Sequence, residues 1–455
     1  MTTASSGTDT PLTRLVDRLW QIRPAEADYA AAEMRCYDAA VAMTLGPTVH
    51  VWPAARSVLA TLWRTQPPGY RTPSGALAAT LATCCRITEV DDIHLRSCTT
   101  PGSIVIPVAL ALATAGLPRP ALLRGVVIGY EAVVGASESI GGAYALRHGV
   151  WPTRAVAPLA AAVTAAAAIG LNRDQAMAAV ALAAGTNITG TMPEPARELG
   201  LGYAVLAGLA AAVTAADGVA GDPGLLARWP GLASAGAGPG PLEPVPDASL
   251  AVRETCIKPF CAARQSMAAT AAVAGLAAAE KLTAGQVVEV EAGVPAAHVA
   301  MVSRSRIGSR LDAIASLPYQ IALAVQCPAM LDDIDRPPPW PTAGIAALME
   351  KVRVVPEPDL DAAFPARWGA SVRVTASDGT YAQTISEVPS ERSLTWPSLA
   401  GKADRLFARA QIDPAETAAL SEQVRGDDLA QLAERLYERA MRGAPEGSNR
   451  WASWL

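Results

Sequence analysis

Side chains that could move protons near neutral pH are few in this sequence. Histidine changes charge most readily in that range, and only four occur, His50, His94, His148 and His298. The seven cysteines have no spacing typical of a zinc site; they are Cys36, Cys84, Cys85, Cys98, Cys256, Cys261 and Cys327. We expect the adjacent Cys84 and Cys85 to be buried on a helix. The sequence therefore predicts no metal site, and any acid–base chemistry has few histidines to use.

Composition argues against several classes of function. The net charge is -5 and is spread without blocks, and no basic patch with interleaved aromatics occurs, so we expect no nucleic-acid partner. No glycine-rich phosphate loop follows a predicted strand, which argues against a nucleotide cofactor. Residues 238–241 are interpreted as a flexible linker instead.

The sequence also indicates a protein outside membranes. No apolar run is expected to reach membrane-spanning length. The alanine-rich stretch 155–170 is better explained by close-packed helices. The polar residues 1–10 are predicted to be disordered and do not resemble a signal peptide. Together with cysteines that form no disulfide framework, these features predict a cytoplasmic location.

Helical periodicity dominates the first half of the chain. The predicted helices span 12–22, 25–45, 54–63, 76–85, 104–115, 122–140, 155–169, 173–184 and 202–216. Pro101-Gly102 suits a helix start, and Asn172 is a plausible N-cap. Residues 11–256 are thus predicted to form one large helical domain.

The pattern changes after a segment rich in Gly, Pro and Ala at 234–246. Strand-like runs at 286–294, 352–355, 371–375 and 381–388 alternate with helices predicted at 266–281 and 311–325. Ser377–Thr380 is typical of a hairpin turn. Residues 257–391 are therefore predicted to form a small α+β domain. Helices at 397–410, 414–425 and 429–441 follow, with Pro397 and Pro414 suited to first helical positions, and residues 392–455 are expected to pack back on the helical domain.

Five segments, taken in order, resemble the MmgE/PrpD family of 2-methylcitrate dehydratases and cis-aconitate decarboxylases. Each is short, but their shared order along most of the chain makes the resemblance specific. They are Glu89–His94 followed by Pro101–Pro107, similar to the family's Asp-Asp-Thr-His and His-Pro-Gly stretches; Gly129–Glu131, its Gly-Tyr-Glu; Val150–Thr153, its His-Pro-Thr; Lys258–Arg264, its Lys-Pro-Tyr-Pro-x-Cys-Arg; and Ser316–Tyr319, its Ser-Leu-Pro-Tyr.

This resemblance implies a mainly α fold, in which a large all-helical domain is closed by a smaller α+β lid. It also implies a homodimer that acts on a small organic acid without a metal or organic cofactor. Such chemistry needs cations for substrate carboxylates and an acid or base within reach of carbon.

The resemblance assigns the cationic and aromatic site residues. Lys258 matches an active-site lysine, as carboxylate anchor or proton donor, against the alternative of a solvated surface lysine. Arg264 is a bidentate anchor or a domain-hinge salt bridge. Arg197 falls where relatives have another lysine, or forms an Arg-Glu helix pair. Tyr319 matches an active-site tyrosine or is a buried core residue.

The first motif supplies the acids. Asp91 and Asp92 fit the family's paired acids, of which one is expected to orient a partner side chain and the other to cap a helix. Glu89 falls where some relatives carry an active-site acid.

Departures from the family pattern concern its imidazoles. Thr100 stands where relatives have the His of His-Pro-Gly, Trp151 where they have the His of His-Pro-Thr, and Ile93 where they often have Thr. His94 is then the most attractive replacement base, or else a loop histidine. His148, three residues before Trp151, is a further candidate for the pocket.

These exchanges make the predicted pocket more apolar and less able to transfer protons. A tricarboxylate would lose partners there and be costly to desolvate. We therefore predict a lyase or isomerase acting on a larger, less charged substrate by dehydration, decarboxylation, isomerisation or cyclisation in a specialised biosynthetic pathway. The alternatives are a non-catalytic binding or scaffold protein that kept the fold, and an ordinary 2-methylcitrate-type dehydratase.

Overall fold

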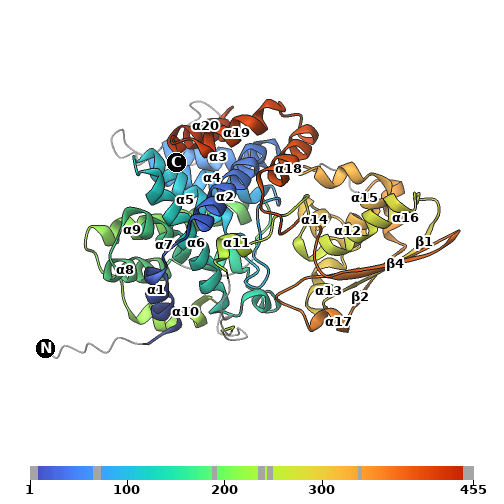
Figure 1. Ribbon diagram of the computed structural model, residues 1–455, viewed down its shortest axis with the longest axis horizontal. Coiled ribbons are helices and arrows are strands. Elements are labelled where there is room, and N and C mark those ends of the chain that lie inside the picture. Colours follow the sequence, from blue (N-terminus) through green and yellow to red (C-terminus); the bar gives the residue numbers. More distant parts are fainter. Residues whose placement is uncertain are drawn as a thin grey trace, which may run out of the picture.

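The computed structural model describes residues 9–64, 73–186, 192–233, 241–242, 249–336 and 341–443. It shows a large helical body beside a smaller α+β unit (Figure 1), so the predicted fold class is confirmed. Residues 1–8 and the linker residues 238–240 lie outside the described residues. Thr10 was included in the predicted disorder, but it is ordered because its side chain caps the first helix by accepting a hydrogen bond from the Thr13 amide.

The helical body is formed mainly by the first 254 residues of the chain. Its elements are α1 (Pro11–Gln21), α2 (Glu26–Leu45), η1 (Gly46–Thr48), α3 (Trp52–Arg64), α4 (Pro73–Ile87), α5 (Gly102–Thr114), α6 (Arg119–Glu138), η2 (Gly142–His148), α7 (Pro152–Ile169), α8 (Arg173–Ala184), α9 (Ala196–Ala216), α10 (Gly224–Ala233) and α11 (Ala251–Glu254).

Small residues let the central helices α6, α7 and α9 pack closely. Helix α7 begins with Pro152 and ends at Ile169, and the next residue, Gly170, has a left-handed φ of 78°, a conformation that favours glycine. A side chain at Gly208 of α9 would collide with the carbonyl of Pro158 in α7. The alanine-rich sequence therefore forms close helix contacts, as its composition predicts.

Two of these helices are longer and more apolar than the sequence analysis allowed. Helices α7 and α9 are long and apolar enough to cross a membrane by length and composition alone, but most of each apolar stretch is buried inside the protein. The expectation that no apolar run reaches spanning length was too strict. Burial against neighbouring helices explains their composition equally well.

The α+β unit follows the body in sequence. Its elements are α12 (Arg264–Ala279), β1 (Val287–Val294), α13 (Ala296–Val302), α14 (Arg310–Ala315), α15 (Leu317–Gln326), η3 (Pro328–Asp332), α16 (Ala343–Met349), β2 (Val352–Pro356), α17 (Pro358–Asp361), β3 (Ala370–Ala376) and β4 (Gly379–Ile385).

The four strands form one mixed sheet in the order β2-β1-β3-β4. Strands β1 and β2 run parallel, whereas β3 pairs antiparallel with both β1 and β4. Strand β3 alternates, with Ala370, Val372, Val374 and Ala376 buried, as a sheet with one covered face requires. Helices α12 and α15 contact this sheet and form the unit's own core with it.

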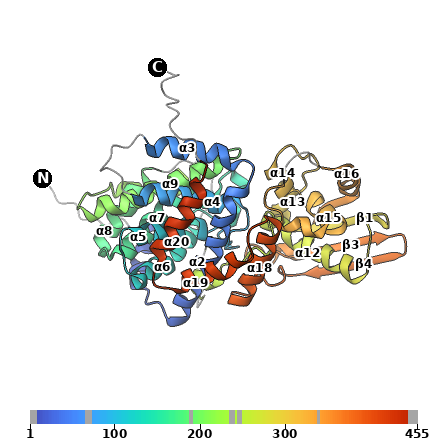
Figure 2. The same ribbon diagram turned by 90° about the horizontal axis from the view of Figure 1, so that it is seen from above.

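The chain ends on the body again. Helices α18 (Trp396–Arg409), α19 (Ala415–Arg425) and α20 (Leu429–Met441) pack against α2, α4 and α5, and their buried residues belong to the body's core. Figure 2 shows α18 lying between body and α+β unit. The domain boundaries at 256/257 and 391/392 stay predictions.

Most predicted elements agree with the structure within a few residues, and three details differ. The helix predicted at 311–325 is two helices, because Ser316 lies between them with an extended backbone and caps α15 through the Tyr319 amide. Pro414 precedes α19 as its N-cap. Helices α10, α11, α13, α16 and α17 were not predicted. Asn172 caps α8 as expected, and Cys84 and Cys85 are buried on α4.

An aromatic contact joins the body to the α+β unit. His298 of α13 packs edge-on against Trp368 and Phe364, with ring centroids 4.8 and 5.3 Å away, and Phe364 packs against Tyr144 of η2 at 5.2 Å. The Nδ1 atom of His298 is buried and has no hydrogen-bond partner among the described residues. Burial, with the charges of Arg264 and Arg147, lowers the pKa of His298 from 6.5 to about 3.

This contact predicts a pH dependence of stability. The folded state keeps His298 neutral, whereas the unfolded chain takes up a proton below the ordinary pKa, so stability is lost as pH falls from 6.5 towards 3. Between about pH 7.5 and about pH 5.5 the wild type should lose roughly 1.4 kcal/mol more unfolding free energy than His298→Phe. Urea unfolding at both values measures this. Equal losses in the two proteins would contradict it.

Candidate functional site

A short backbone pairing brings the segment Glu89–His94 next to the segment that leads into Lys258–Arg264. Ile93 and Cys256 form an antiparallel bridge, with N–O distances of 2.9 and 2.8 Å. Two residues before Ile93 and two residues after Cys256, the antiparallel pairing places Asp91 opposite Lys258. Lys258 Nζ lies 3.2 Å from Asp91 Oδ1. Residues far apart in sequence are thus placed side by side by backbone hydrogen bonds.

Three cations converge on the carboxylate of Glu89. Arg86, in the last turn of α4, places its NH2 atom 2.7 Å from both Glu89 oxygens. Arg197, in the first turn of α9, donates to Glu89 Oε1. Lys258 Nζ lies 3.5 Å from Glu89 Oε2 and 3.4 Å from the Glu89 carbonyl.

Two further carboxylates balance these charges. Arg86 NH1 lies 2.8 Å from Asp91 Oδ1, and Arg197 Nε lies 2.6 Å from Glu198 Oε1. We call these six side chains the Lys258 cluster: Arg86, Glu89, Asp91, Arg197, Glu198 and Lys258. It contains three cations and three carboxylates, so it is neutral overall when all six are ionised.

Trp151 forms one wall of the Lys258 cluster. As the N-cap of α7, it places its ring 5.0 Å from the guanidinium carbon of Arg197 and 5.7 Å from that of Arg86, within the range of cation–π attraction. Arg197 is the most exposed cluster member, at 16% of its side chain, whereas Lys258 is 2% exposed. Solvent therefore reaches the cluster through Arg197 and the half-buried Trp151.

The acids Glu89, Asp91 and Asp92 of the first motif have different partners, and the pKa values of Glu89 and Asp92 are shifted in opposite directions. Burial raises the pKa of Glu89, but Arg86, Arg197 and Lys258 outweigh it and hold that pKa well below the usual range. Asp92 points away and accepts hydrogen bonds from the Tyr130 hydroxyl at 2.6 Å and the first amide of α5, of Gly102, at 2.9 Å. Burial raises the pKa of Asp92 to about 6. Asp91 therefore forms ion pairs within the Lys258 cluster, whereas Asp92 accepts a hydrogen bond from the first amide of α5.

Neither candidate replacement histidine contacts the Lys258 cluster among the described residues. His94 Nδ1 lies 2.9 Å from the Ser97 hydroxyl, and burial with nearby arginines lowers its pKa to about 3, which makes it a weak base. His148 is exposed at the end of η2. The arrangement favours the alternative that His94 is a loop histidine.

Thr100 and Ile93 lie in segments next to the Lys258 cluster but make no hydrogen bond to its charged side chains among the described residues. The Thr100 amide donates to Thr153 Oγ1 at 3.2 Å, which connects the start of α5 to the first turn of α7 beside Trp151. Ile93 packs in a small apolar cluster with Cys98 and Trp368. The hydrogen bond of Thr100 with Thr153 joins the two segments that carry the replaced histidine positions, Thr100 and Trp151.

Two predicted site residues have other partners. Arg264, fully buried at the start of α12, forms a bidentate pair with Glu391 at 2.7 and 2.8 Å and donates to the Trp368 carbonyl at 3.1 Å. These contacts favour the hinge salt bridge over the substrate anchor. Tyr319 is buried in the core of the α+β unit, and no described hydrogen bond joins its hydroxyl to Lys258. These observations favour the alternative that Tyr319 is a buried core residue.

Sequence reasoning missed one member of the cluster, Arg86, which is the cation that binds both Glu89 and Asp91. Glu198 forms with Arg197 the Arg-Glu helix pair that the sequence offered as an alternative for Arg197. A signal for Arg86 was present, because it precedes Glu89 by three residues at a helix end, a spacing at which charged side chains meet.

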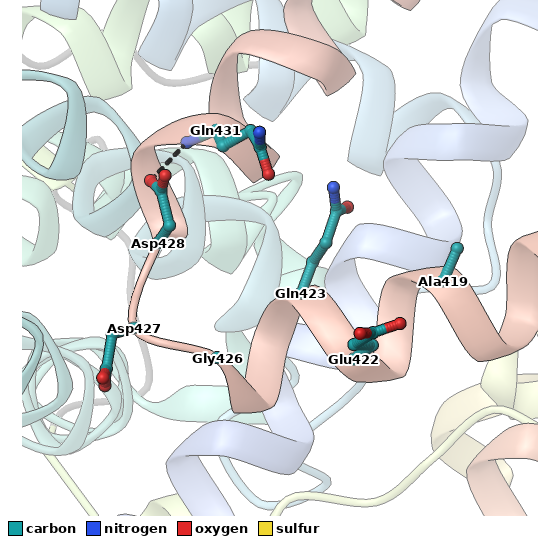
Figure 3. A pocket seen from close by; sticks show the side chains of 7 residues that line it. All are labelled: Ala419, Glu422, Gln423, Gly426, Asp427, Asp428 and Gln431. Carbon is teal, nitrogen blue, oxygen red and sulfur yellow. Dashed lines mark hydrogen bonds between the residues drawn. The ribbon is translucent and has the colours of Figure 1, made fainter.

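Two hollows among the described residues lie away from the Lys258 cluster. One opens between α19 and α20, where Asp428 accepts from the Gln431 amide at 2.8 Å (Figure 3). The other is a small apolar gap between α1, α6, α7 and α8. No predicted site residue lines either one. Within the described residues, no group of three or more His, Cys, Asp or Glu side chains could hold a metal ion.

Comparison with protein families matches both halves of the chain. The MmgE/PrpD N-terminal domain matches residues 28–244, and the MmgE/PrpD C-terminal domain matches residues 260–425. No curated protein matches the chain. The gap between the two matches, residues 245–259, contains α11 and Lys258 and precedes α12.

Proposed function

Because the chain belongs to the MmgE/PrpD family, whose members are generally lyases, we propose that it is a cofactor-independent lyase or isomerase with an altered substrate. The substrate is a small organic acid that is larger and less charged than methylcitrate. The reaction is a dehydration, decarboxylation, isomerisation or cyclisation in a biosynthetic pathway. A cytoplasmic homodimer is part of the same proposal.

The observation that carries this proposal is the charge balance of the Lys258 cluster. Its three cations are already paired with three carboxylates. A polycarboxylate would add several negative charges to a buried site that has no surplus of positive charge, and each would be costly to desolvate. A substrate with one carboxylate and a larger apolar part meets a smaller penalty.

Trp151 supports the same conclusion from the apolar side. An indole ring is larger than the imidazole that it replaces in the family pattern, and it offers an apolar surface where a proton-transferring group is expected. Its contacts with Arg197 and Arg86 hold the ring over the cluster. This surface suits an apolar substituent of the substrate.

Lys258 and Asp91 supply the proton transfers of the proposal. In a dehydration, the carboxylate of Asp91 takes the proton from carbon, the C–O bond breaks as the C=C bond forms, and Lys258 gives a proton to the departing hydroxide. Lys258 contacts Asp91, so a proton can return between turnovers. Exclusion of water around these groups strengthens their electrostatic effect.

A graded series of substrates tests the proposal. We expect purified protein to convert 3-hydroxy acids with one carboxylate to unsaturated acids, with kcat/KM rising as the apolar substituent grows, and the product's ultraviolet absorbance measures the rate. Preparations lacking the protein serve as controls. If no member of the series turns over but some bind, the proposal of an enzyme fails and the binding or scaffold protein is supported.

A further inference from the structure

The amine of Lys258 is enclosed by the protein. Its side chain is 2% exposed, and the hollows beside α20 and α1 do not reach it. A substrate or a reagent can therefore meet this amine only after part of the structure moves. Arg197 is the most exposed member of the Lys258 cluster, at 16% of its side chain, so movement near Arg197 uncovers the cluster with the least rearrangement.

Residues 192–195 lie on that side of the cluster, directly before the first turn of α9. A Cβ atom at Gly200 of α9 would lie 2.7 Å from Met192 Cε and 3.0 Å from Arg154 Nε. Arg154 belongs to the first turn of α7. Met192 therefore lies where the starts of α9 and α7 meet, and these two helix starts hold the arginine and the indole ring that form the exposed side of the cluster. We call residues 192–195 the strap.

Arg310 of the α+β unit holds the strap in place. Its Nη1 atom lies 2.5 Å from Glu194 Oε1, and the Arg310 and Glu194 side chains are 1% and 7% exposed. The same guanidinium donates to the Ile334 carbonyl at 2.7 Å and to the Thr88 carbonyl at 3.4 Å. Thr88 immediately precedes Glu89, so one side chain connects the strap, the α+β unit and the loop that carries two acids of the cluster.

The ion pair between Glu194 and Arg310 is balanced between burial and attraction. Burial raises the pKa of Glu194, and the carboxylates of Glu198 and Glu89 add to that rise, whereas Arg310 and Arg197 oppose it. Separation of the pair costs its Coulomb attraction. Because separation also returns both groups to water, the recovered solvation offsets much of that cost. The pair is therefore suited to open and close.

We propose that the strap covers the Lys258 cluster, that the Glu194–Arg310 ion pair keeps it closed, and that a substrate reaches Lys258 when this pair opens. The proposal deepens the proposed function and rests on it for the claim that the substrate goes to Lys258. Since Glu194 belongs to the body and Arg310 to the α+β unit, the contact between the two units controls access to the cluster.

Amine labelling of Glu194→Gln tests the strap directly. This variant removes the charge, retains the side-chain shape and leaves the two backbone contacts of Arg310 in place. Acetic anhydride is the reagent, and mass spectrometry of peptides measures the rate at each lysine. We expect Lys258 to be acetylated at least about tenfold faster than in the wild type, the scale of a lost charge-assisted hydrogen bond. Lys402, which is buried in an ion pair with Asp38, reports global unfolding and should keep its wild-type rate.

Glu416→Gln is the matched control, because it removes a glutamate from another ion pair with arginine, that with Arg435 between α19 and α20. Both buried lysines should keep their wild-type rates in this variant. If Glu194→Gln does not fold, Glu194→Ala provides the same comparison. An unchanged rate at Lys258 in a folded Glu194 variant, equal rises at Lys258 and Lys402, or failure of both variants to fold overturns the proposal. Because labelling requires no turnover, this result is separate from failure of the proposed reaction.

Discussion

Lys258→Met is expected to lower kcat/KM by about 10²- to 10⁴-fold on any substrate that the wild type converts, the usual loss when a proton-transferring group is removed. Lys258 contacts both Glu89 and Asp91, and no other lysine joins the cluster. Methionine retains much of the length and apolar surface of the lysine stem, so the variant removes the charge with little change of volume. Initial rates at subsaturating substrate measure the effect.

Lys351→Met is the matched control. Lys351 precedes β2, and its Nζ donates to the Val287 carbonyl at 2.6 Å, away from the cluster. We expect wild-type kcat/KM in this variant. If both variants retain full activity while circular dichroism shows a folded protein, the chemistry does not take place at Lys258.

Arg264→Leu should lower the free energy of unfolding by about 3–5 kcal/mol, the usual cost of leaving one member of a buried ion pair alone. Arg264 and Glu391 are 1% and 0% exposed, so water cannot solvate the remaining carboxylate. The lost hydrogen bond to the Trp368 carbonyl adds to the effect. Urea unfolding followed by fluorescence measures it.

The double variant Arg264→Leu with Glu391→Leu distinguishes a structural pair from a substrate anchor. Replacing both partners of a buried pair by apolar residues is often nearly neutral, so we expect most of the lost stability to return. A stable Arg264→Leu protein with weakened substrate binding would instead support the anchor that the sequence suggested.

Local sequence patterns predicted the elements well because helix periodicity and strand alternation depend on nearby residues. Asn172 and the helix after it are an example, since the cap and the apolar stripe lie within one segment. Helix 311–325 was predicted as continuous because the break at Ser316 depends on a side-chain cap that leaves the apolar pattern intact. The short helices α13, α16 and α17 span too few turns to show a clear period.

The site was predicted in part. Ordered motifs identified Glu89, Asp91, Lys258 and Trp151, and the structure brings these together. The partners of Arg264 could not be predicted, because Glu391 lies more than a hundred residues away and outside every motif. The surroundings of His94 could not be predicted either. The Ile93–Cys256 bridge joins segments far apart in sequence, and its pairing decides which side chains face Lys258.

The turnover of 2-methylcitrate and cis-aconitate by the wild-type protein tests the central claim most directly. If internal carboxylates neutralise the cations around Lys258, neither acid should be converted above the rate of a Lys258→Met preparation, at concentrations where the monocarboxylate series reacts. Robust conversion of either acid would contradict the account, because it would show that this buried, neutral cluster accepts a highly charged substrate.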